Sequence, residues 1–412
     1  MQRRSFLKSL AAAPAAFAAL SRRAEAALPK TKITRVRIYR PPELNLIFNQ
    51  SNMLVTVETE AGITGIGEGG SKDTLEQCAG SLIGKDPFKT EAIWQEEYMA
   101  WFYPPGREKQ DAMGALDLAL WDIKGKALGL PIHQLLGGAV RQYCECYNTG
   151  NVRPPAAAGG AQPTVKERVQ ATLAAGYKLY RIDAADPGGG PWDVRARLLE
   201  LAREAKEIRE ALGSSGDWSV DFHQRFEYAD ALRGCQLIEE YAPYLVEDPV
   251  RDEHFLEDIP KLRRMTPLPL AAGEEWGWRW DFNKLVENHD IDYNRCTLPN
   301  VGGITEMLKI MALCETHAVG MVPHFTGPVA TAGLVNCLVT FPYSVLFEYN
   351  YADHKIPYLP EYVDFKGGKV YPNERPGLGV TIDTSLLTQI GEVTQPVHRR
   401  IYNRPDGSLT HW

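Results

Sequence analysis

The period of the hydrophobic pattern divides the chain near residue 141. Before that point, apolar and polar residues alternate over residues 31–39, 52–60 and 63–68, which predicts three strands of an antiparallel meander. Three helical patterns follow, over residues 72–83, 90–102 and 109–129. The pattern therefore predicts a small α+β domain over residues 27–140.

Short apolar runs alternate with helical patterns after residue 141. Eight runs are expected as strands, near residues 143–147, 178–182, 218–222, 244–246, 268–271, 291–294, 319–322 and 344–347. Helical patterns fill most of the gaps, for example over residues 304–317. This alternation predicts an α/β fold with a parallel (β/α) barrel over residues 141–364, in which the chemistry lies at the carboxyl ends of the strands. Residues 365–412 are rich in Pro and Gly, and the pattern gives them no role in the barrel.

Residues 1–26 have the pattern of an export signal. Arg3 and Arg4 precede an apolar run over residues 10–20, and Ala24-Glu25-Ala26 offers a cleavage site between small residues. This segment resembles a twin-arginine signal peptide, which predicts a periplasmic protein. The alternative is a chance pair of arginines on a cytosolic extension. The apolar run is too short for a stable membrane anchor.

Composition narrows the classes of partner. A chain of 412 residues, 44% of them hydrophobic, can form two domains with a large core. The net charge is −7, so the chain has no excess of basic residues that would bind phosphates, and we expect no nucleic-acid partner. Seven cysteines without zinc-type spacing are expected as buried free thiols, because an odd number in a chain of this size argues against a disulfide scaffold.

Three carboxylates follow three successive apolar runs. Asp221, Glu247 and Glu274 are separated by 26 and 27 residues, about one strand–helix unit each. The carboxyl ends of barrel strands meet at one face, and carboxylate oxygens are ligands for Mg²⁺, so the spacing predicts a magnesium site. His223 is two residues beyond Asp221, and alternation along an extended chain would place both side chains on one side. Any single carboxylate at a strand end could instead cap a helix or face solvent.

Other strand ends carry further candidates. His324 ends the seventh predicted strand, opposite the carboxylates, and is either a catalytic or a structural histidine. Glu348 ends the eighth and could bind substrate or accept a buried hydrogen bond. Arg181 and Arg295, at the ends of the second and sixth, could bind substrate or pair with neighbouring carboxylates. Residues 65–70 match G-x-G-x-x-G, but no second parallel strand with an acidic end follows, which argues against dinucleotide binding.

Together these motifs resemble the enolase superfamily, in its mandelate racemase-like branch. The chain is most similar to the acid-sugar dehydratases that act on galactonate or mannonate. The resemblance covers nearly all residues after the signal, and its motifs are Val57–Glu68, Asp221-Phe222-His223, Val246–Pro249, Gly273-Glu274, Arg279–Phe282, Gly302–Thr305, Pro323-His324 and Asp406–Trp412.

The resemblance implies a modified TIM barrel, a capping first domain, and a tail, residues 365–412, that packs back on the cap. It places the Mg²⁺ ligands on Asp221, Glu247 and Glu274, and the catalytic acid on His223. His324 and Glu348 match site positions on strands seven and eight. Arg181 matches a strand-two arginine of the mannonate enzymes, which makes it a catalytic candidate, and Asn52 matches a substrate-binding asparagine of the cap.

One departure concerns the general base. Galactonate dehydratases carry an Asp on strand six that pairs with the strand-seven histidine, and this chain has Thr297 there. His324 would then lack the partner that fixes its tautomer. Residues 295–297 are similar to the mannonate type, in which the base belongs to strand two.

The implied activity is Mg²⁺-dependent dehydration of a sugar acid. Removal of the α-proton would give an enediolate, and loss of the β-hydroxyl as water would give a 2-keto-3-deoxy acid. The alternatives are a racemase or epimerase on the same scaffold, or a protein that binds a metal or a sugar acid with little catalysis. The sequence leaves the sugar acid open, and loops 42–52 and 101–108 of the cap are expected to decide it. Such barrels are expected to form homo-oligomers.

Overall fold

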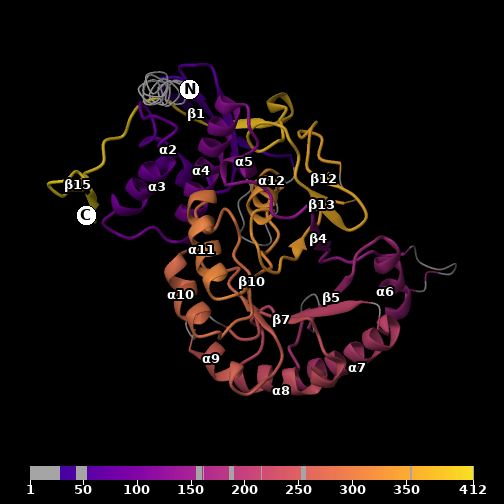
Figure 1. The fold of residues 1–412 in the computed structure, drawn as a ribbon. Coiled ribbons are helices and arrows are strands. Elements are labelled where there is room, and N and C mark those ends of the chain that lie inside the picture. Colours follow the sequence, from indigo (N-terminus) through magenta and orange to yellow (C-terminus); the bar gives the residue numbers. More distant parts are fainter. Residues whose placement is uncertain are drawn as a thin grey trace, which may run out of the picture.

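The protein is described by a computed structural model. The residues described are 28–42, 53–154, 160, 162–184, 190–214, 216–251, 257–352 and 355–411. They form a cap domain that lies over one end of a barrel (Figure 1). The predicted modified TIM barrel with an N-terminal α+β cap is confirmed.

The cap is built on a four-stranded antiparallel sheet. Its strands β1 (Ile33–Arg40), β2 (Leu54–Thr59) and β3 (Thr64–Glu68) form the predicted meander. Helices α2 (Lys72–Ala79), α3 (Thr90–Met99) and α4 (Arg107–Leu128) follow, and a short helix α5 (Ile132–Leu135) leads toward the barrel. A Cβ at Gly65 or Gly67 would overlap with backbone carbonyls of α4, so these glycines allow the helix to approach the sheet closely.

Eight parallel strands form the barrel. They are β4 (Cys144–Tyr147), β5 (Leu179–Asp183), β6 (Asp217–Asp221), β7 (Leu245–Glu247), β8 (Leu270–Ala272), β9 (Tyr293–Asn294), β10 (Gly320–Met321) and β11 (Phe347–Glu348). Strands β5 to β10 pair in sequence order, and β11 pairs with β4. A bridge between Met321 and Val345 joins β10 to the segment that leads into β11. The strands lie where the hydrophobic pattern predicted them.

Seven helices separate the eight strands. They are α6 (Val165–Ala174), α7 (Val194–Leu212), α8 (Tyr228–Ile238), α9 (Asp258–Arg263), α10 (Arg279–Glu287), α11 (Ile304–Thr316) and α12 (Pro328–Leu338). Short 3-10 turns, η1 (Glu239–Tyr241) and η2 (Thr384–Leu386), lie in connecting segments. No α-helix follows β11 in the described part of the chain, which makes the barrel a modified one.

The C-terminal segment joins both domains. Strands β12 (Asp364–Phe365) and β13 (Lys369–Tyr371) form a hairpin, and β13 pairs with barrel strand β4. The expectation that residues 365–412 have no role in the barrel is therefore wrong. Beyond it, β14 (Thr388–Val393) pairs with β1 at the edge of the cap sheet, and β15 (Tyr402–Asn403) and β16 (Leu409–Thr410) form a hairpin beside α3 (Figure 1).

Buried polar contacts fix the cap over the barrel. The Glu68 carboxylate, at the end of β3, accepts hydrogen bonds from the amides of Val329 (2.7 Å) and Ala330 (2.9 Å) at the start of α12. Asp117 of α4 accepts bonds from the amide and hydroxyl of Thr305 at the start of α11, at 2.9 and 2.6 Å. Both carboxylates therefore satisfy donors that a helix leaves unpaired at its first turn.

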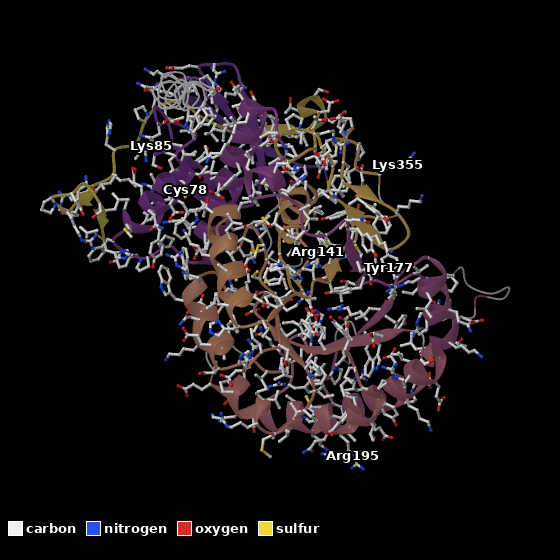
Figure 2. The ribbon with its side chains drawn as sticks, in the orientation of Figure 1. Cys78, Lys85, Arg141, Tyr177, Arg195 and Lys355 are labelled. Carbon is white, nitrogen blue, oxygen red and sulfur yellow. The ribbon has the colours of Figure 1, made fainter. Side chains whose placement is uncertain are left out.

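All seven cysteines are buried and free, as predicted. Cys78, labelled in Figure 2, lies in the cap near the end of α2. Among the described helices, none is long and apolar enough to cross a membrane.

Burial raises the pKa of Glu68 to about 8, from an ordinary value of 4.5. The folded state therefore binds a proton more tightly than the unfolded state, and this stabilisation is lost as the pH rises through about 8. Between pH 5 and pH 9, we expect the unfolding free energy of the wild type to fall further than that of Glu68→Gln. The difference between the two losses should be on the order of 2–4 kcal/mol. Urea unfolding at the two pH values measures this difference. Equal losses in both proteins would show that Glu68 does not titrate in this way.

Candidate metal centre and active site

A cavity of about 570 Å³ lies between the barrel mouth and the cap. The cap contributes Ser71, Arg107, Glu108 and Asp111 to its lining. The barrel contributes Thr149, Arg181, Asp183, His223, Gln224, Arg225, Asp248, Glu274, Glu275, Asn300, His324, Phe325 and Glu348. Most of the side chains that line it are charged or polar and can form hydrogen bonds with a hydrophilic molecule.

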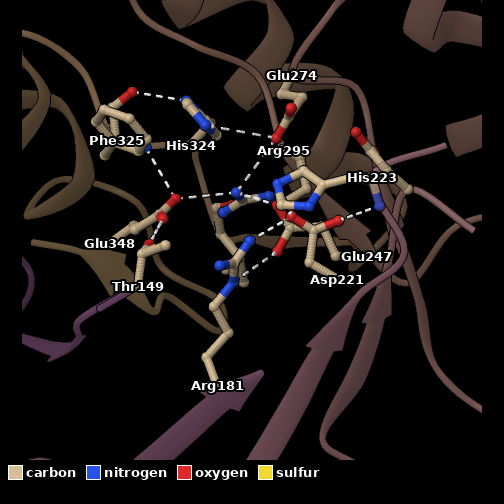
Figure 3. A network of polar contacts seen from close by, with 12 residues as sticks. Thr149, Arg181, Asp221, His223, Glu247, Glu274, Arg295, His324, Phe325 and Glu348 are labelled. Carbon is tan, nitrogen blue, oxygen red and sulfur yellow. Dashed lines mark hydrogen bonds and ion pairs between the residues drawn. The ribbon is translucent and has the colours of Figure 1, made fainter. Parts of the chain in front are cut away.

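Three carboxylates meet at the base of this cavity (Figure 3). Asp221 is the last residue of β6 and is in register with Glu247, the last residue of β7, while Glu274 lies two residues beyond β8. One oxygen of each lies within 4.8 Å of the others. Asp221 and Glu247 are buried, and Glu274 is partly exposed to the cavity. The structure thus brings the three predicted ligands together.

His223 reaches Asp221 by a turn of the backbone. Strand β6 ends at Asp221, and His223 has a φ of +48°, which is uncommon for a residue with a side chain. Its amide donates to Asp221 Oδ1 at 2.6 Å, and its Nε2 lies 2.7 Å from Asp221 Oδ2. The two residues therefore share one side of the site because of this turn, and the strand alternation used in the sequence argument is not the cause.

Two buried arginines hold the carboxylates. Arg181 of β5 forms ion pairs with Asp221 and with Asp183, the latter at 2.6 Å. Arg295, just beyond β9, pairs with Glu247 and lies 2.9 Å from Glu348 and 3.6 Å from Glu274. Its other terminal nitrogen, Nη1, donates to the Tyr147 hydroxyl and the Val322 carbonyl. Both arginines therefore pair with carboxylates, as one reading of the sequence proposed.

The carboxylates outnumber the cations that neutralise them. Asp221, Glu247, Glu274 and Glu348 share the guanidinium groups of Arg181 and Arg295. Burial raises the pKa of Glu247 to about 8 and that of Glu274 to about 7, and the nearby charge of Asp221 adds to both shifts. Burial also opposes the ionisation of Asp221 and Glu348, but Arg181 and Arg295 respectively hold the pKa of each below its usual range.

The donor set fits a divalent cation. Oε2 of Glu274 is buried and has no hydrogen-bond partner among the described residues. Hard oxygen donors from three elements surround a common point, and an excess of buried negative charge is stabilised by a cation placed there. A second group with ligand atoms within 4.8 Å is formed by Asp183, Asp221 and His223, and it shares Asp221 with the first.

His324 obtains a fixed tautomer from the backbone. Its Nδ1 lies 2.7 Å from the carbonyl oxygen of Phe325, and a carbonyl can only accept a hydrogen bond, so Nδ1 carries the proton. Nε2 is then the basic nitrogen, and it lies 3.6 Å from Glu274 Oε2. Burial lowers the pKa of His324, which favours the neutral imidazole. The missing Asp of strand six therefore does not leave this ring without a partner.

Thr297 contacts the backbone of Glu274, whereas an aspartate at this position was expected to pair with His324. Its hydroxyl lies 3.4 Å from the carbonyl oxygen of Glu274, and the side chain of Asn300 lies 3.3 Å from the same oxygen. These contacts hold the loop that carries Glu274. Thr297 is thus part of the support of a carboxylate in the cluster.

Glu348 anchors the wall opposite His223. Its Oε2 accepts from the Phe325 amide at 2.9 Å, and its Oε1 accepts from the Thr149 hydroxyl (Figure 3). The bond to Phe325 fixes the same residue whose carbonyl orients His324. Glu348 therefore positions His324 through the backbone and also lines the cavity.

Sequence reasoning passed over several lining residues. Asp183 is the last residue of β5, and Thr149 lies two residues beyond the end of β4. A search of all residues at the carboxyl ends of the strands could therefore have found both. Arg107 falls within the cap loop 101–108 that was expected to select the substrate. Glu275 lies in a loop, where the sequence carries no comparable signal. Asn52, the candidate of the cap, lies outside the described residues.

Two domain families and several curated relatives match this chain. The chain matches the mandelate racemase/muconate lactonizing enzyme N-terminal domain over residues 32–137 and the enolase C-terminal domain-like family over residues 164–386. It is 34% identical to a D-galactonate dehydratase of Ralstonia pickettii and 33% identical to one of Pectobacterium atrosepticum; each alignment covers 92% of this chain and all of the relative.

Solved structures show the same architecture. A member of the enolase superfamily from Salmonella Typhimurium is 26% identical, with a TM-score of 0.78 over 88% of this chain and all of the other. An enolase protein from environmental sequencing of the Sargasso Sea is also 26% identical, with a TM-score of 0.78 over 89% of this chain and all of the other. The chain therefore belongs to the enolase superfamily, in its mandelate racemase and muconate lactonizing enzyme branch.

Proposed function

We propose that this hydro-lyase of the enolase superfamily is a Mg²⁺-dependent dehydratase of a sugar acid, with a 2-keto-3-deoxy acid as its product. The observation that carries the proposal is the cluster of Asp221, Glu247 and Glu274 between two histidines of different protonation preference. Relatives named D-galactonate dehydratase, 33–34% identical over their full length, support this chemistry and make D-galactonate the first substrate to test.

Asp221, Glu247 and Glu274 would hold the Mg²⁺. When bound, the ion would supply positive charge to the substrate carboxylate and so stabilise the second negative charge that forms when the α-proton leaves. The excess of buried carboxylates over the two arginines favours binding of a divalent cation by oxygen ligands. The pairs with Arg181 and Arg295 hold the ligands near one another.

His324 is suited to take the α-proton. Its neutral ring carries a proton on Nδ1, so Nε2 has a free lone pair directed toward the carboxylate cluster. Phe325 and Glu348 fix the ring position through the backbone. A base placed in this way accelerates proton transfer by about 10²–10⁴-fold.

His223 is suited to protonate the departing hydroxyl. Burial disfavours its charged form, but its hydrogen bond to the Asp221 carboxylate raises its pKa above the ordinary value. Nδ1 accepts from a guanidinium nitrogen of Arg225 at 2.9 Å and lies 3.5 Å from Asp183, so the ring proton is on Nε2, facing Asp221. An imidazole that retains its proton in this setting can donate it as the β-hydroxyl leaves as water.

The two arginines and Glu348 have different relations to the cavity. Arg181 and Glu348 line it, so they can contact the substrate. Arg295 is fully buried below the carboxylates and is not among the described residues that line the cavity, so we assign it to hold Glu247 and Glu348. Asn52 of the cap is retained as a substrate-binding candidate by resemblance alone.

A dehydration screen tests the proposed activity. The mature protein, loaded with Mg²⁺, is incubated with a stereochemical library of acid sugars, and 2-keto-3-deoxy acids are detected as semicarbazones. At least one aldonate should be dehydrated, and chelation of the metal should stop the reaction. α-Hydrogen exchange with inversion and no keto product would establish a racemase or epimerase instead.

Removal of any one ligand should weaken the metal site. Asp221→Asn, Glu247→Gln and Glu274→Gln each keep the shape of the side chain but remove a charge, so Mg²⁺ affinity should fall at least about tenfold in each. Isothermal titration calorimetry measures the affinity, and thermal unfolding checks that each variant is folded. Asp258→Asn, in the first turn of α9 and paired with Lys261, is the control and should leave affinity unchanged. Unchanged affinity in all three variants would refute the assigned site.

The two histidines should separate the two halves of the reaction. His223→Asn should retain α-hydrogen exchange in D₂O but lose about 10²–10⁴-fold in dehydration, because only the acid is removed. His324→Asn should lose both, because the α-proton then stays on the substrate. Proton NMR in D₂O follows exchange and product together.

His289→Asn is the matched control, since His289 is exposed and has a φ of +55°, a conformation that Asn tolerates. Its exchange and dehydration should equal those of the wild type. Exchange at the wild-type rate in His324→Asn would place the base elsewhere, and the mannonate-type arrangement on strand two, β5 here, would then be preferred.

We further propose that the protein is exported to the periplasm by the twin-arginine route, on the pattern of residues 1–26, which lie outside the described residues. A reporter fused after Ala27 should reach the periplasm, and Arg3→Lys with Arg4→Lys should retain it in the cytoplasm. Cell fractionation measures both. Export of the double variant at the original level would contradict this proposal.

A further inference from the structure

Trp101 packs against the core of the cap and lies between two cationic side chains. Lys109 Nζ lies 3.6 Å from the centre of its ring, and the guanidinium carbon of Arg399 lies 3.9 Å from it. The indole nitrogen is buried and has no hydrogen-bond partner among the described residues. The ring is therefore held in place by the two cations and by other groups that pack against its faces.

Arg399 belongs to the C-terminal segment and is itself firmly held. One of its nitrogens pairs with Glu97 of α3 at 2.7 Å, and another donates to the carbonyl of Gln77 in α2 at 2.6 Å. The side chains of Arg399 and Glu97 are only 8% and 3% exposed, so solvent weakens this pair little. Two residues earlier, the Val397 amide donates to the Gly80 carbonyl at 2.8 Å, beside the end of α2 that Cys78 marks in Figure 2.

Lys109 belongs to the turn of the cap that faces the cavity. It lies in the first turn of α4, and Arg107, Glu108 and Asp111 of the same region line the cavity. The residue before this turn is Gly106, which offers no side-chain cap to the helix. The nearest partner of Arg107 is Glu275, at 3.9 Å between two half-exposed side chains, and such a pair fixes position only weakly.

We propose that Arg399 is a positioning residue for substrate recognition. It fixes Trp101, Trp101 fixes Lys109, and Lys109 fixes the first turn of α4, which presents Arg107 and Glu108 to the cavity. The proposal rests on the proposed function in one respect, that the cavity binds the substrate. It gives the C-terminal segment a part in binding although none of its described residues lines the cavity.

Steady-state kinetics of the full mature enzyme test this coupling. Arg399→Met should raise KM for the sugar acid about tenfold, because one cation–π contact is lost, and should change kcat by less than about twofold. Arg399→Lys retains a cation over the ring and should recover part of the loss. Lys109→Met removes the opposite cation and should raise KM in the same way. The double variant should raise KM by less than the product of the two single effects, because both act through Trp101.

Arg404→Met is the matched control, since Arg404 lies in the same segment and donates to Ser408 and Leu409 of its own hairpin. Its KM should equal that of the wild type. An unchanged KM in both Arg399→Met and Lys109→Met, or a fall in kcat without a rise in KM, would overturn the proposal. If Arg399→Met does not fold, Lys109→Met decides alone.

Hydrogen exchange separates this proposal from the proposed function. Amides of residues 101–110 should exchange faster in Arg399→Met than in Arg404→Met, whether or not any sugar acid is turned over. If the wild type dehydrates no acid sugar, the proposed function fails, and exchange then decides the positioning role. Unaltered exchange over residues 101–110 would overturn that role.

Discussion

An excess of buried carboxylates at the barrel mouth is the constraint on which the structure depends. Asp221, Glu247, Glu274 and Glu348 share the two guanidinium groups of Arg181 and Arg295. Unpaired buried charge costs far more than exposed charge, so such a centre persists only if it is neutralised by protonation or by a bound cation. The raised pKa values of Glu247 and Glu274 show that their charged forms are the ones disfavoured by burial and by the charge of Asp221. A divalent ion bound by the clustered oxygens of Asp221, Glu247 and Glu274 would stabilise those charged forms.

The rest of the fold encloses this centre and orders its surroundings. The parallel strands bring their carboxyl ends to one face, and the cap covers that face through the contacts of Glu68 and Asp117 with the first turns of α12 and α11. The C-terminal segment adds a strand to the cap sheet and pairs with β4 in the barrel, so it ties the two domains together. The cavity between them is lined by His223 and His324, the two histidines to which the proposed function assigns the proton transfers.

The sequence predicted the features that are local and periodic. Barrel strands, the order of the cap elements and the three carboxylates follow from apolar runs and their spacing, and each lies at or within a few residues of the predicted place. It could not predict contacts that depend on loop geometry or on distant segments. The bond of His324 to the Phe325 carbonyl and the place of Arg399 over Trp101 carry no pattern in the chain. Strand β13 is too short to show alternation, which is why its pairing with β4 was not expected.

Anomalous diffraction from crystals grown with Mn²⁺ tests the central claim most directly, because Mn²⁺ prefers the same oxygen ligands as Mg²⁺ and its position can be seen without bias. The account predicts one strong anomalous peak within about 2.5 Å of oxygens from Asp221, Glu247 and Glu274. A map with no peak there, and with Arg181 and Arg295 as the only cations among these carboxylates, would contradict it.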